Sequence, residues 1–319
     1  MTILLSINDL SIGYEAQKPL VSSMNWEIHA GEIHTLLGPN GSGKTTLIKV
    51  ISERMSSLSG NIEFYTDYDK KGDVKKFRRK PSNEKFLSVS FGGPQGFFPK
   101  ANIFENLKYF SLLKGIPYSE SNTEVQSALD LVNLTKYSKT NFNELSLGMK
   151  QRLHIARSVI GNPKLLILDE PGNGLDAQSL SELNSLLTNL AQKGTGIIIS
   201  THLFSQIEKL DTRINVIAHG KFLHFNSLEN FTKSSALQLV TQFNIQDVNF
   251  AKVLDIISEL PGIKYQYFQN GSRYAFNVYL ESSLHYMELQ TSLLNVVSDV
   301  DYSTPRKPHI DEMYMSLIL

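Results

Sequence analysis

Short apolar runs alternate with helical patterns over the first two thirds of the chain. The runs Ile33 to Leu37, Leu165 to Leu168 and Ile197 to Ser200 are apolar on both faces, which is typical of parallel strands buried within a sheet. Each run is followed by a turn or helix signal, so the pattern predicts an α/β core. The stretch between Ser119 and Ala156 has mostly helical spacing, and we expect a helical subdomain there.

The pattern changes near Phe231 to Ser235, so we place a boundary there and expect domains at 1–231 and 232–319. Asn270-Gly271 is a hairpin-turn signal between two strand-like runs. The predicted elements of the second domain are the strand Ala236 to Phe243, the helix Val248 to Leu260, the strands Ile263 to Phe268 and Tyr274 to Leu280, the helix Leu284 to Val297 and the strand Val300 to Tyr302. This β-α-β-β-α-β order predicts a smaller α+β domain of the ferredoxin-like kind.

A polar segment from Asp67 to Lys85 carries a cluster of cationic side chains. The cluster comprises Lys75, Lys76, Arg78, Arg79 and Lys80. We interpret the segment as a solvated loop or an edge hairpin, and contact with anionic lipid or a partner is the alternative. It lacks the interleaved aromatic residues that stacking on nucleic acid requires.

Composition narrows the class of protein. A length of 319 residues favours one large domain and a smaller one. The formal net charge is zero, so charge gives no reason to expect nucleic acid as a partner. The absence of cysteine excludes disulfides and is compatible with a reducing cytoplasm. Met1 to Asn8 lacks the features of a signal peptide, and no apolar run approaches the roughly 20 residues that span a bilayer. A membrane process would therefore need another chain to cross the membrane.

A phosphate-binding loop is the clearest chemical motif. The pattern G-x-x-x-x-G-K-[ST] is matched by Gly38, Pro39, Asn40, Gly41, Ser42, Gly43, Lys44 and Thr45, and Thr46 follows. The loop lies between a predicted strand and a helical stretch, Thr46 to Ser52, as a phosphate loop requires. Its glycines let backbone N–H groups and a helix start face the phosphates. Lys44 would neutralise phosphate charge, and the Thr45 hydroxyl could ligate Mg²⁺.

Two carboxylates end the strand Leu165 to Leu168. Asp169 is placed to hold the Mg²⁺ shell. Glu170 follows and could polarise a water aligned with the γ-phosphate of ATP. The alternative interpretation is that the two acids face solvent and only cap the strand. The phosphate loop in the same chain favours the nucleotide site over that alternative.

The segment Glu144 to Arg152 resembles the signature motif of ATP-binding-cassette (ABC) ATPases. Ser146 and Gly148 lie at the start of a predicted helix, Met149 to Ile160, and such a helix start is an anion site. The resemblance implies that this signature binds the γ-phosphate of ATP held on another subunit. It also implies a P-loop NTPase fold with antiparallel β and helical subdomains.

Other motifs follow in the order of that family, and the resemblance extends from Leu4 to Leu228. It implies that Tyr14 stacks on adenine, that Gly174-Leu175-Asp176 is a D-loop touching the opposite subunit, and that His202 contacts the γ-phosphate. A narrower similarity to bacitracin- and lantibiotic-type exporter ATPases rests on the segments Phe97 to Leu107, Leu145 to Leu153, Ser200 to Glu208 and His309 to Met315.

The Q-loop departs from the family pattern. Its glutamine position falls on Gly93, and Gln95 lies two residues later, so Gln95 is our candidate for the catalytic and Mg²⁺-sensing side chain. The alternative is that the site lacks this side chain. Phe97 and Phe98 suit docking of a membrane partner's helix, and burial within the cassette is the alternative.

The resemblance implies an ATPase that uses ATP and Mg²⁺ and drives a separate transmembrane permease subunit from the cytoplasmic face of the membrane. One phosphate loop and one signature per chain imply a head-to-tail pair, either a homodimer or a heterodimer with a paralogous subunit. The substrate would be a peptide, an antibiotic or a lipid-like molecule. The alternatives are a soluble ABC ATPase not tied to transport, and an ATP-dependent dimerisation switch with little hydrolysis.

Overall fold

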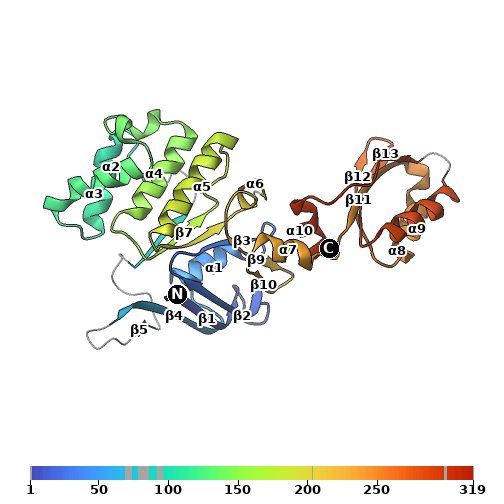
Figure 1. Cartoon of the computed structure of the whole chain (residues 1–319), viewed down its shortest axis with the longest axis horizontal. Coiled ribbons are helices and arrows are strands. Elements are labelled where there is room, and N and C mark those ends of the chain that lie inside the picture. The colour runs from blue at the N-terminus through green and yellow to red at the C-terminus, as the bar shows by residue number, and fades with distance from the viewer. Residues whose placement is uncertain are drawn as a thin grey trace. The chain divides into compact units, whose positions relative to one another are not determined.

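The computed structural model describes residues 2–68, 74–77, 86–91, 96–202, 204–297 and 300–318. The chain divides into two compact units, Met1–Leu228 and Glu229–Leu319 (Figure 1). The division lies within helix α7 (Leu228–Ser234), three residues before the boundary expected from the sequence. That the two units are separate domains stays a prediction.

The first unit is built on a mostly parallel, six-stranded sheet in the order β10-β9-β3-β8-β7-β6. Its strands are β3 (Ile33–Leu37), β6 (Leu87–Phe91), β7 (Leu165–Asp169), β8 (Gly196–Ser200), β9 (Arg213–Ala218) and β10 (Lys221–Phe225). Only β10 pairs antiparallel. The runs predicted as buried strands form β3, β7 and β8, three neighbours at the centre of the sheet. Their carboxyl ends therefore meet at one edge.

Alternate residues of the central strands enter two different cores. Leu166 and Leu168 of β7 pack with the helices α2 to α5, whereas Leu165 and Ile167 pack with α1 and the N-terminal strands. The helices are α1 (Lys44–Ile51), α2 (Ile103–Leu113), α3 (Tyr118–Leu131), α4 (Leu147–Val159), α5 (Ala177–Gln192) and α6 (Phe204–Ile207), with 3₁₀ turns η1 (Thr135–Tyr137) and η2 (Phe142–Glu144). Burial on both faces explains why these strands read as continuous apolar runs.

The helical subdomain is longer than the sequence pattern predicted. The subdomain consists of α2, α3 and α4 (Figure 1). It begins at Ile103 with α2, whereas the sequence pattern predicted a start near Ser119. The Asn102 side chain caps α2 by accepting from the N–H of Glu105 at 2.8 Å. The prediction missed α2 because its apolar residues occur on more than one side, which obscures the helical period.

A second, antiparallel sheet in the order β2-β1-β4-β5 covers the other side of α1. Its strands are β1 (Ile3–Ile12), β2 (Val21–His29), β4 (Ser59–Tyr68) and β5 (Val74–Phe77). The pairing of β4 with the edge strand β5 agrees with the edge-hairpin interpretation of the lysine-rich segment. The rest of that segment, 69–73 and 78–85, lies outside the described residues.

The second unit is a four-stranded sheet with two helices on one face (Figure 1). Its elements are β11 (Leu239–Gln246), η3 (Asp247–Asn249), α8 (Phe250–Glu259), β12 (Ile263–Asn270), β13 (Arg273–Leu280), α9 (Ser283–Leu294), β14 (Asp301–Tyr302) and α10 (Ile310–Ile318). The six elements of the predicted β-α-β-β-α-β pattern occur in that order as β11, α8, β12, β13, α9 and β14, and the strands are arranged β12-β13-β11-β14. The ferredoxin-like assignment stays a prediction. Among the described residues, no helix has the length and apolar character needed to cross a membrane.

Candidate functional site

The phosphate loop joins β3 to α1 and borders a cavity of about 400 Å³. Gly43 caps α1 with φ 110° and Gly41 has φ 82°, backbone conformations that L side chains rarely adopt. The cavity is lined by Tyr14, Leu20, Asn40, Gly41, Gly43, Lys44, Thr45, Thr46 and Glu170. The structure thus gathers most of the predicted nucleotide-binding residues around one cavity.

Lys44 is buried with its ammonium against the loop backbone. Its Nζ donates to the carbonyl oxygens of Gly38 at 2.6 Å and Pro39 at 3.2 Å. Burial lowers the pKa of Lys44, and the carboxylates of Glu170 and Asp169 oppose that shift. The Lys44 ammonium therefore lies near two carboxylates and contacts two backbone carbonyl groups. Because Lys44 also lines the cavity, its positive charge is placed to neutralise an anion there.

Asp169 is held by hydroxyl groups from two other elements. It ends β7 beside Ser200 of β8, and the two residues are paired in the parallel register. Ser200 Oγ donates to Asp169 Oδ1, and Thr45 Oγ1 donates to Asp169 Oδ2 at 3.1 Å. Our reading of the sequence did not assign a role to Ser200. A signal was present, because Ser200 is a hydroxyl residue at the end of a run predicted as a buried strand. Asp169 lies at the end of the neighbouring strand.

Glu170 lies in the left-handed region with φ 51°, which is uncommon for a residue with a side chain. Its N–H donates to Ser200, to the backbone oxygen at 3.1 Å and to Oγ at 2.9 Å, and this holds the unusual turn. Its Oε2 lies 2.7 Å from Nδ1 of His202. That oxygen accepts no aligned hydrogen bond from the described residues, so the two side chains approach closely without one. The predicted base and the predicted γ-phosphate contact are therefore neighbours.

The donor set fits ATP and Mg²⁺. Tyr14 is 70% exposed and its hydroxyl lies 3.3 Å from Thr46 Oγ1, so its ring is accessible at the mouth of the cavity. Ser42 Oγ is buried without a hydrogen-bond partner among the described residues, but Ser42 does not line the cavity. The Thr45 hydroxyl and the Asp169 carboxylate are the oxygen donors that Mg²⁺ prefers.

The signature and D-loop residues form a second cluster that does not line the cavity. Ser146 caps α4 by accepting from the N–H of Met149, and Asp176 caps α5 by accepting from the N–H of Ser179 at 2.7 Å. Hydrogen bonding to Ser179 lowers the pKa of Asp176. A side chain on Gly148 would approach Ser179 Oγ at 3.1 Å, so the two helix starts lie close together.

The predicted Q-loop residues have different outcomes. Gly93 and Gln95 lie outside the described residues. Phe97 is buried, and the suggestion that it docks a partner is therefore wrong. Its ring stacks on Phe142 with a centroid distance of 4.8 Å. Phe98 is 51% exposed and stays available for docking.

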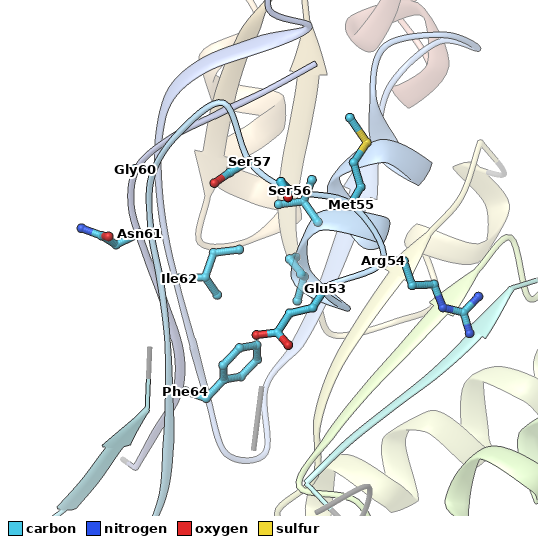
Figure 2. A pocket seen from close by; sticks show the side chains of 11 residues that line it. Glu53, Arg54, Met55, Ser56, Ser57, Gly60, Asn61, Ile62 and Phe64 are labelled. Atoms are coloured by element: carbon cyan, nitrogen blue, oxygen red, sulfur yellow. The ribbon is translucent and has the colours of Figure 1, made fainter. Parts of the chain in front are cut away.

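A second cavity of about 490 Å³ opens at the C-terminal end of α1 (Figure 2). It is lined by the turn after α1 and by β4, including Glu53, Arg54, Met55 and Asn61. The guanidinium of Arg54 lies 4.5 Å from the ring centroid of Phe91. Although larger, this cavity has no phosphate-loop residue in its wall.

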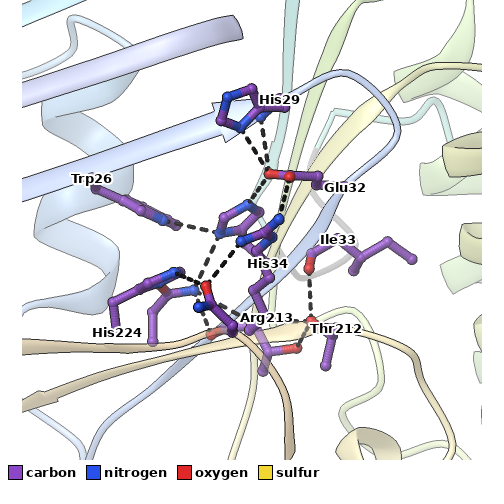
Figure 3. Close-up of polar contacts among 11 residues, drawn as sticks. Trp26, His29, Glu32, Ile33, His34, Thr212, Arg213 and His224 are labelled. Carbon is purple, nitrogen blue, oxygen red and sulfur yellow. Dashed lines mark hydrogen bonds and ion pairs between the residues drawn. The ribbon is translucent and has the colours of Figure 1, made fainter. Parts of the chain in front are cut away.

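A buried polar network lies beneath the phosphate loop, on the strand that leads to it (Figure 3). His34 of β3 accepts from Trp26 Nε1 at 3.0 Å through Nδ1, and its Nε2 lies 3.0 Å from Glu32. Arg213 donates to the other oxygen of Glu32 at 2.6 Å. Burial alone would raise the pKa of Glu32, but hydrogen bonds from His34 and the His29 backbone, with the charges of His34 and Arg213, lower it to about 2. Both His34 nitrogens have protein partners, so the network is structural and not a ligand site.

Comparison with known proteins places this geometry in a family. The family model described as ABC transporter matches residues 21–173. The bacitracin transport ATP-binding protein BcrA of Bacillus licheniformis is 34% identical over 255 residues, which cover 80% of this chain and 79% of that protein. The lantibiotic transport ATP-binding protein SrtF of Streptococcus pyogenes is 33% identical, with 69% and 89% covered. A spermidine/putrescine import ATP-binding protein, PotA of Borrelia garinii, is 31% identical, with 84% and 76% covered. The solved structure of cbiO1 from Clostridium perfringens has a TM-score of 0.62 and 26% identity, covering 82% of this chain and 97% of that one.

Proposed function

The chain belongs to the family of ATP-binding proteins of ABC transporters, and from this premise we propose that it hydrolyses ATP at the cavity beside the phosphate loop. The observation that carries the proposal is the contact between Glu170 and His202 at the edge of that cavity. A carboxylate beside an imidazole can accept a proton from water while its neighbour senses or stabilises the charge of the phosphate.

Each residue of the site then has a defined task. The phosphate loop, Gly38 to Thr46, binds the phosphates through its backbone, and Tyr14 stacks on adenine. Lys44 stabilises negative charge on the β- and γ-phosphates. Glu170 orients the attacking water and takes its proton, and His202 contacts the γ-phosphate. Ser200 holds the Asp169 carboxylate and the Glu170 backbone N–H, so it is a positioning residue.

Thr45 and Asp169 would hold Mg²⁺. When bound, this ion supplies positive charge that neutralises the phosphate oxygens. The hydrogen bond between Thr45 and Asp169 keeps their two oxygen atoms on the same side of the site. Gln95 is proposed as a further ligand or water contact because it follows the glycine that occupies the usual glutamine position.

We propose that the working unit contains two ATP-binding subunits arranged head to tail. Ser146 and Gly148 lie at a helix start suited to an anion, but they do not line the chain's own cavity. A second chain would supply its signature to this cavity, and Asp176 would lie at the interface between them. Two copies of this chain satisfy that need, and so does a paralogous subunit.

The family implies a transmembrane partner, and we propose where it docks. Exposed apolar residues gather on and around α2, namely Phe98, Tyr109, Leu112, Leu113 and Tyr118. Rings of Phe98 and Tyr109 contact each other edge to face at 5.1 Å, which makes a compact aromatic surface. Docking there would hold the chain at the cytoplasmic face of the membrane. We propose export of a peptide, an antibiotic or a lipid-like molecule, and the bacitracin and lantibiotic transport relatives support that class of substrate.

The test is Glu170→Gln. The variant should bind ATP with near-normal affinity but lose at least about 100-fold in turnover, because the amide cannot accept a proton. Since opening of the pair requires hydrolysis, the variant with ATP should elute as a dimer in size-exclusion chromatography.

The matched control is Glu182→Gln, which alters an exposed carboxylate on α5 that pairs with Arg152. It should leave turnover unchanged. Wild-type turnover in Glu170→Gln would remove the assigned base. Wild-type protein that binds ATP without measurable hydrolysis, with the permease present, would favour the dimerisation switch.

A further inference from the structure

His202 does not face the cavity in which it is expected to act. Its side chain is 51% exposed, and its Nδ1 lies 2.7 Å from Glu170 Oε2. Glu170 is among the described residues that line the cavity, but His202 is not. The proposed contact of His202 with the γ-phosphate therefore requires a second position of this side chain. The contacts of the segment that follows His202 decide how it can reach that position.

That segment is short, and helix α5 holds it from the side. Its helix, α6, has a single turn. Helix α5 is fixed in the core through Leu183 and Leu187, which are buried. Asn184 of α5 is 5% exposed, and its Nδ2 donates to the backbone oxygen of Gln206 in α6 at 3.2 Å. Asn184 thus links a fixed helix to the turn that follows His202.

Three polar side-chain atoms at this link have no hydrogen-bond partner in the part of the chain that the structure describes. They are Asn184 Oδ1 and both amide atoms of Gln206, Oε1 and Nε2, and Gln206 is completely buried. Leaving such atoms unpaired costs free energy, so native structures contain few of them. The orientation of the Asn184 amide is settled, because its Nδ2 faces a carbonyl oxygen, which can only accept.

The unpaired atoms of Asn184 and Gln206 are complementary. Gln206 Nε2 can only donate, and Asn184 Oδ1 can only accept. The two residues are already neighbours, since Asn184 contacts the Gln206 backbone. A shift of α6, with a change in the side-chain torsions of Gln206, would join the two amides and would move the segment that begins at His202. We name Asn184 and Gln206 the amide pair.

We propose that the amide pair positions His202 for contact with the γ-phosphate. In the present arrangement His202 lies against Glu170, and the Gln206 amide is unpaired. When ATP is in the cavity, Gln206 Nε2 donates to Asn184 Oδ1, and His202 reaches the phosphate. The inference rests on the proposed function, because it uses the phosphate contact assigned to His202 there.

The free energies of the two arrangements are compatible with this exchange. A ligand shifts an equilibrium only through contacts that differ between the two arrangements, and the γ-phosphate is such a contact. Moving His202 away from Glu170 removes one favourable approach, which explains why the unpaired arrangement persists. The new amide hydrogen bond offsets part of that loss. Asn184 and Gln206 touch no nucleotide, so they are positioning residues.

Gln206→Met tests the proposal, because methionine has a similar length and shape but no amide. Without nucleotide, its urea midpoint should equal or exceed that of the wild type, since an unpaired buried amide is removed. Its ATP turnover should nevertheless fall about fivefold, the equivalent of one hydrogen bond. Its affinity for ADP should be unchanged, because ADP has no γ-phosphate for His202 to contact. A purely structural role would change stability and turnover in the same direction.

Ile207→Val is the matched control on the same turn. Ile207 is completely buried and apolar, so this variant should have a lower urea midpoint but wild-type turnover. Asn184→Leu removes the acceptor of the amide pair and should lower turnover as Gln206→Met does. The double variant should lose no more turnover than the more impaired single variant, because both changes remove the same hydrogen bond. Losses that multiply would overturn the pairing.

His202→Ala separates failure of the amide pair from failure of the proposed function. This variant should lose turnover, and adding Gln206→Met should cause no further loss, since Gln206 acts through His202. If His202→Ala is impaired but Gln206→Met keeps wild-type turnover or has a lower urea midpoint, the amide pair is overturned and the proposed function stands. Wild-type turnover in His202→Ala would instead remove the phosphate contact from the proposed function, and the amide pair with it.

Discussion

His34 is kept neutral by the directions of its two hydrogen bonds. Trp26 Nε1 can only donate, so Nδ1 of His34 must carry a lone pair and Nε2 carries the proton toward Glu32. Burial lowers the pKa of His34, and the bond with Glu32 opposes that effect. The unfolded chain therefore takes up a proton near pH 6.5 that the folded chain takes up only at lower pH.

Stability should consequently fall as the pH drops below about 6.5. His34→Gln offers the same acceptor to Trp26 and the same donor to Glu32, but it does not titrate. Between pH 6 and pH 5 the wild type should lose up to about 1.4 kcal/mol of unfolding free energy more than the variant. Urea unfolding followed by the fluorescence of Trp26, the only tryptophan, measures this difference within the first unit. Equal pH slopes in the two proteins would contradict the assigned neutral state.

The sequence predicts the role or burial of some single residues but not of others. The phosphate loop could be predicted because its function depends on local backbone geometry, which the glycines and Lys44-Thr45 determine within one short segment. The role of Ser200 could not be predicted in this way. It contacts Asp169 and Glu170 because their strands are neighbours in the sheet, and those residues are 31 and 30 positions away in the chain. For Phe97 the local pattern left docking and burial both open, because its burial depends on Phe142 of a distant turn.

At the scale of elements, α4 is attached to the rest of the helical subdomain through Arg157. Its guanidinium contacts the rings of both Phe97 and Phe110, which meet edge to face, with the Cζ atom 4.9 and 5.0 Å from their centroids. It also donates to Nδ1 of His154 at 3.3 Å. Burial, with the charge of Arg157, lowers the pKa of His154 to about 4, so the imidazole accepts this bond as a neutral group.

Arg157→Lys should lower the unfolding free energy by about 2 kcal/mol, because an ammonium cannot contact both rings and donate to His154 at the same time. Arg152→Lys on the same helix is the control, since its partner Glu182 is 40% exposed and such pairs are worth less than about 1 kcal/mol. Denaturant unfolding of both variants gives the comparison. Equal losses would show that stacking on Phe97 and Phe110 contributes little.

Phe98 is the element-level prediction that concerns the partner. Phe98→Ala should leave the ATPase rate of the isolated chain within about twofold, because this side chain lies outside the cavity. It should weaken co-purification with the permease, since an exposed aromatic side chain in a docking surface commonly contributes about 2 kcal/mol. Tyr137→Ala, which removes another aromatic residue that is 44% exposed, should leave assembly unchanged. Equal recovery of the permease with both variants would remove Phe98 from the docking surface.

Element boundaries were harder to predict than element types. The strands β3, β7 and β8 were recognisable because both faces are buried, whereas β11 begins at Leu239 and not at Ala236. The start of that strand depends on pairing with Leu280 of β13, which the local pattern does not contain. The start of α2 was missed although its cap, Asn102 with Glu105 three residues later, is local, because its packing against α3 and α4 is a tertiary feature.

At the scale of the whole molecule, the change of pattern after the last family motif indicated two units. The sequence predicted their order and approximate sizes, because each unit has its own alternation of strands and helices. It could not indicate that Leu289 of α9 is buried whereas Leu284 and Met287 are exposed. Periodicity alone does not distinguish a residue buried against its own sheet from one that faces outward.

Truncation tests whether nucleotide binding belongs to the first unit alone. A chain that ends at Ser234 keeps α7 complete, including the fully buried Phe231, and removes the second unit after that helix. Its ATP affinity should stay within about threefold of the full chain's, because the residues that line the cavity extend only from Tyr14 to Glu170. Isothermal titration calorimetry measures the affinity, and circular dichroism establishes that the shortened chain is folded. Lys44→Ala in the shortened chain is the control and should abolish measurable binding, since the ammonium that faces the phosphates is lost. If the shortened chain folds but does not bind ATP, the second unit contributes to the site and the predicted domain boundary is wrong.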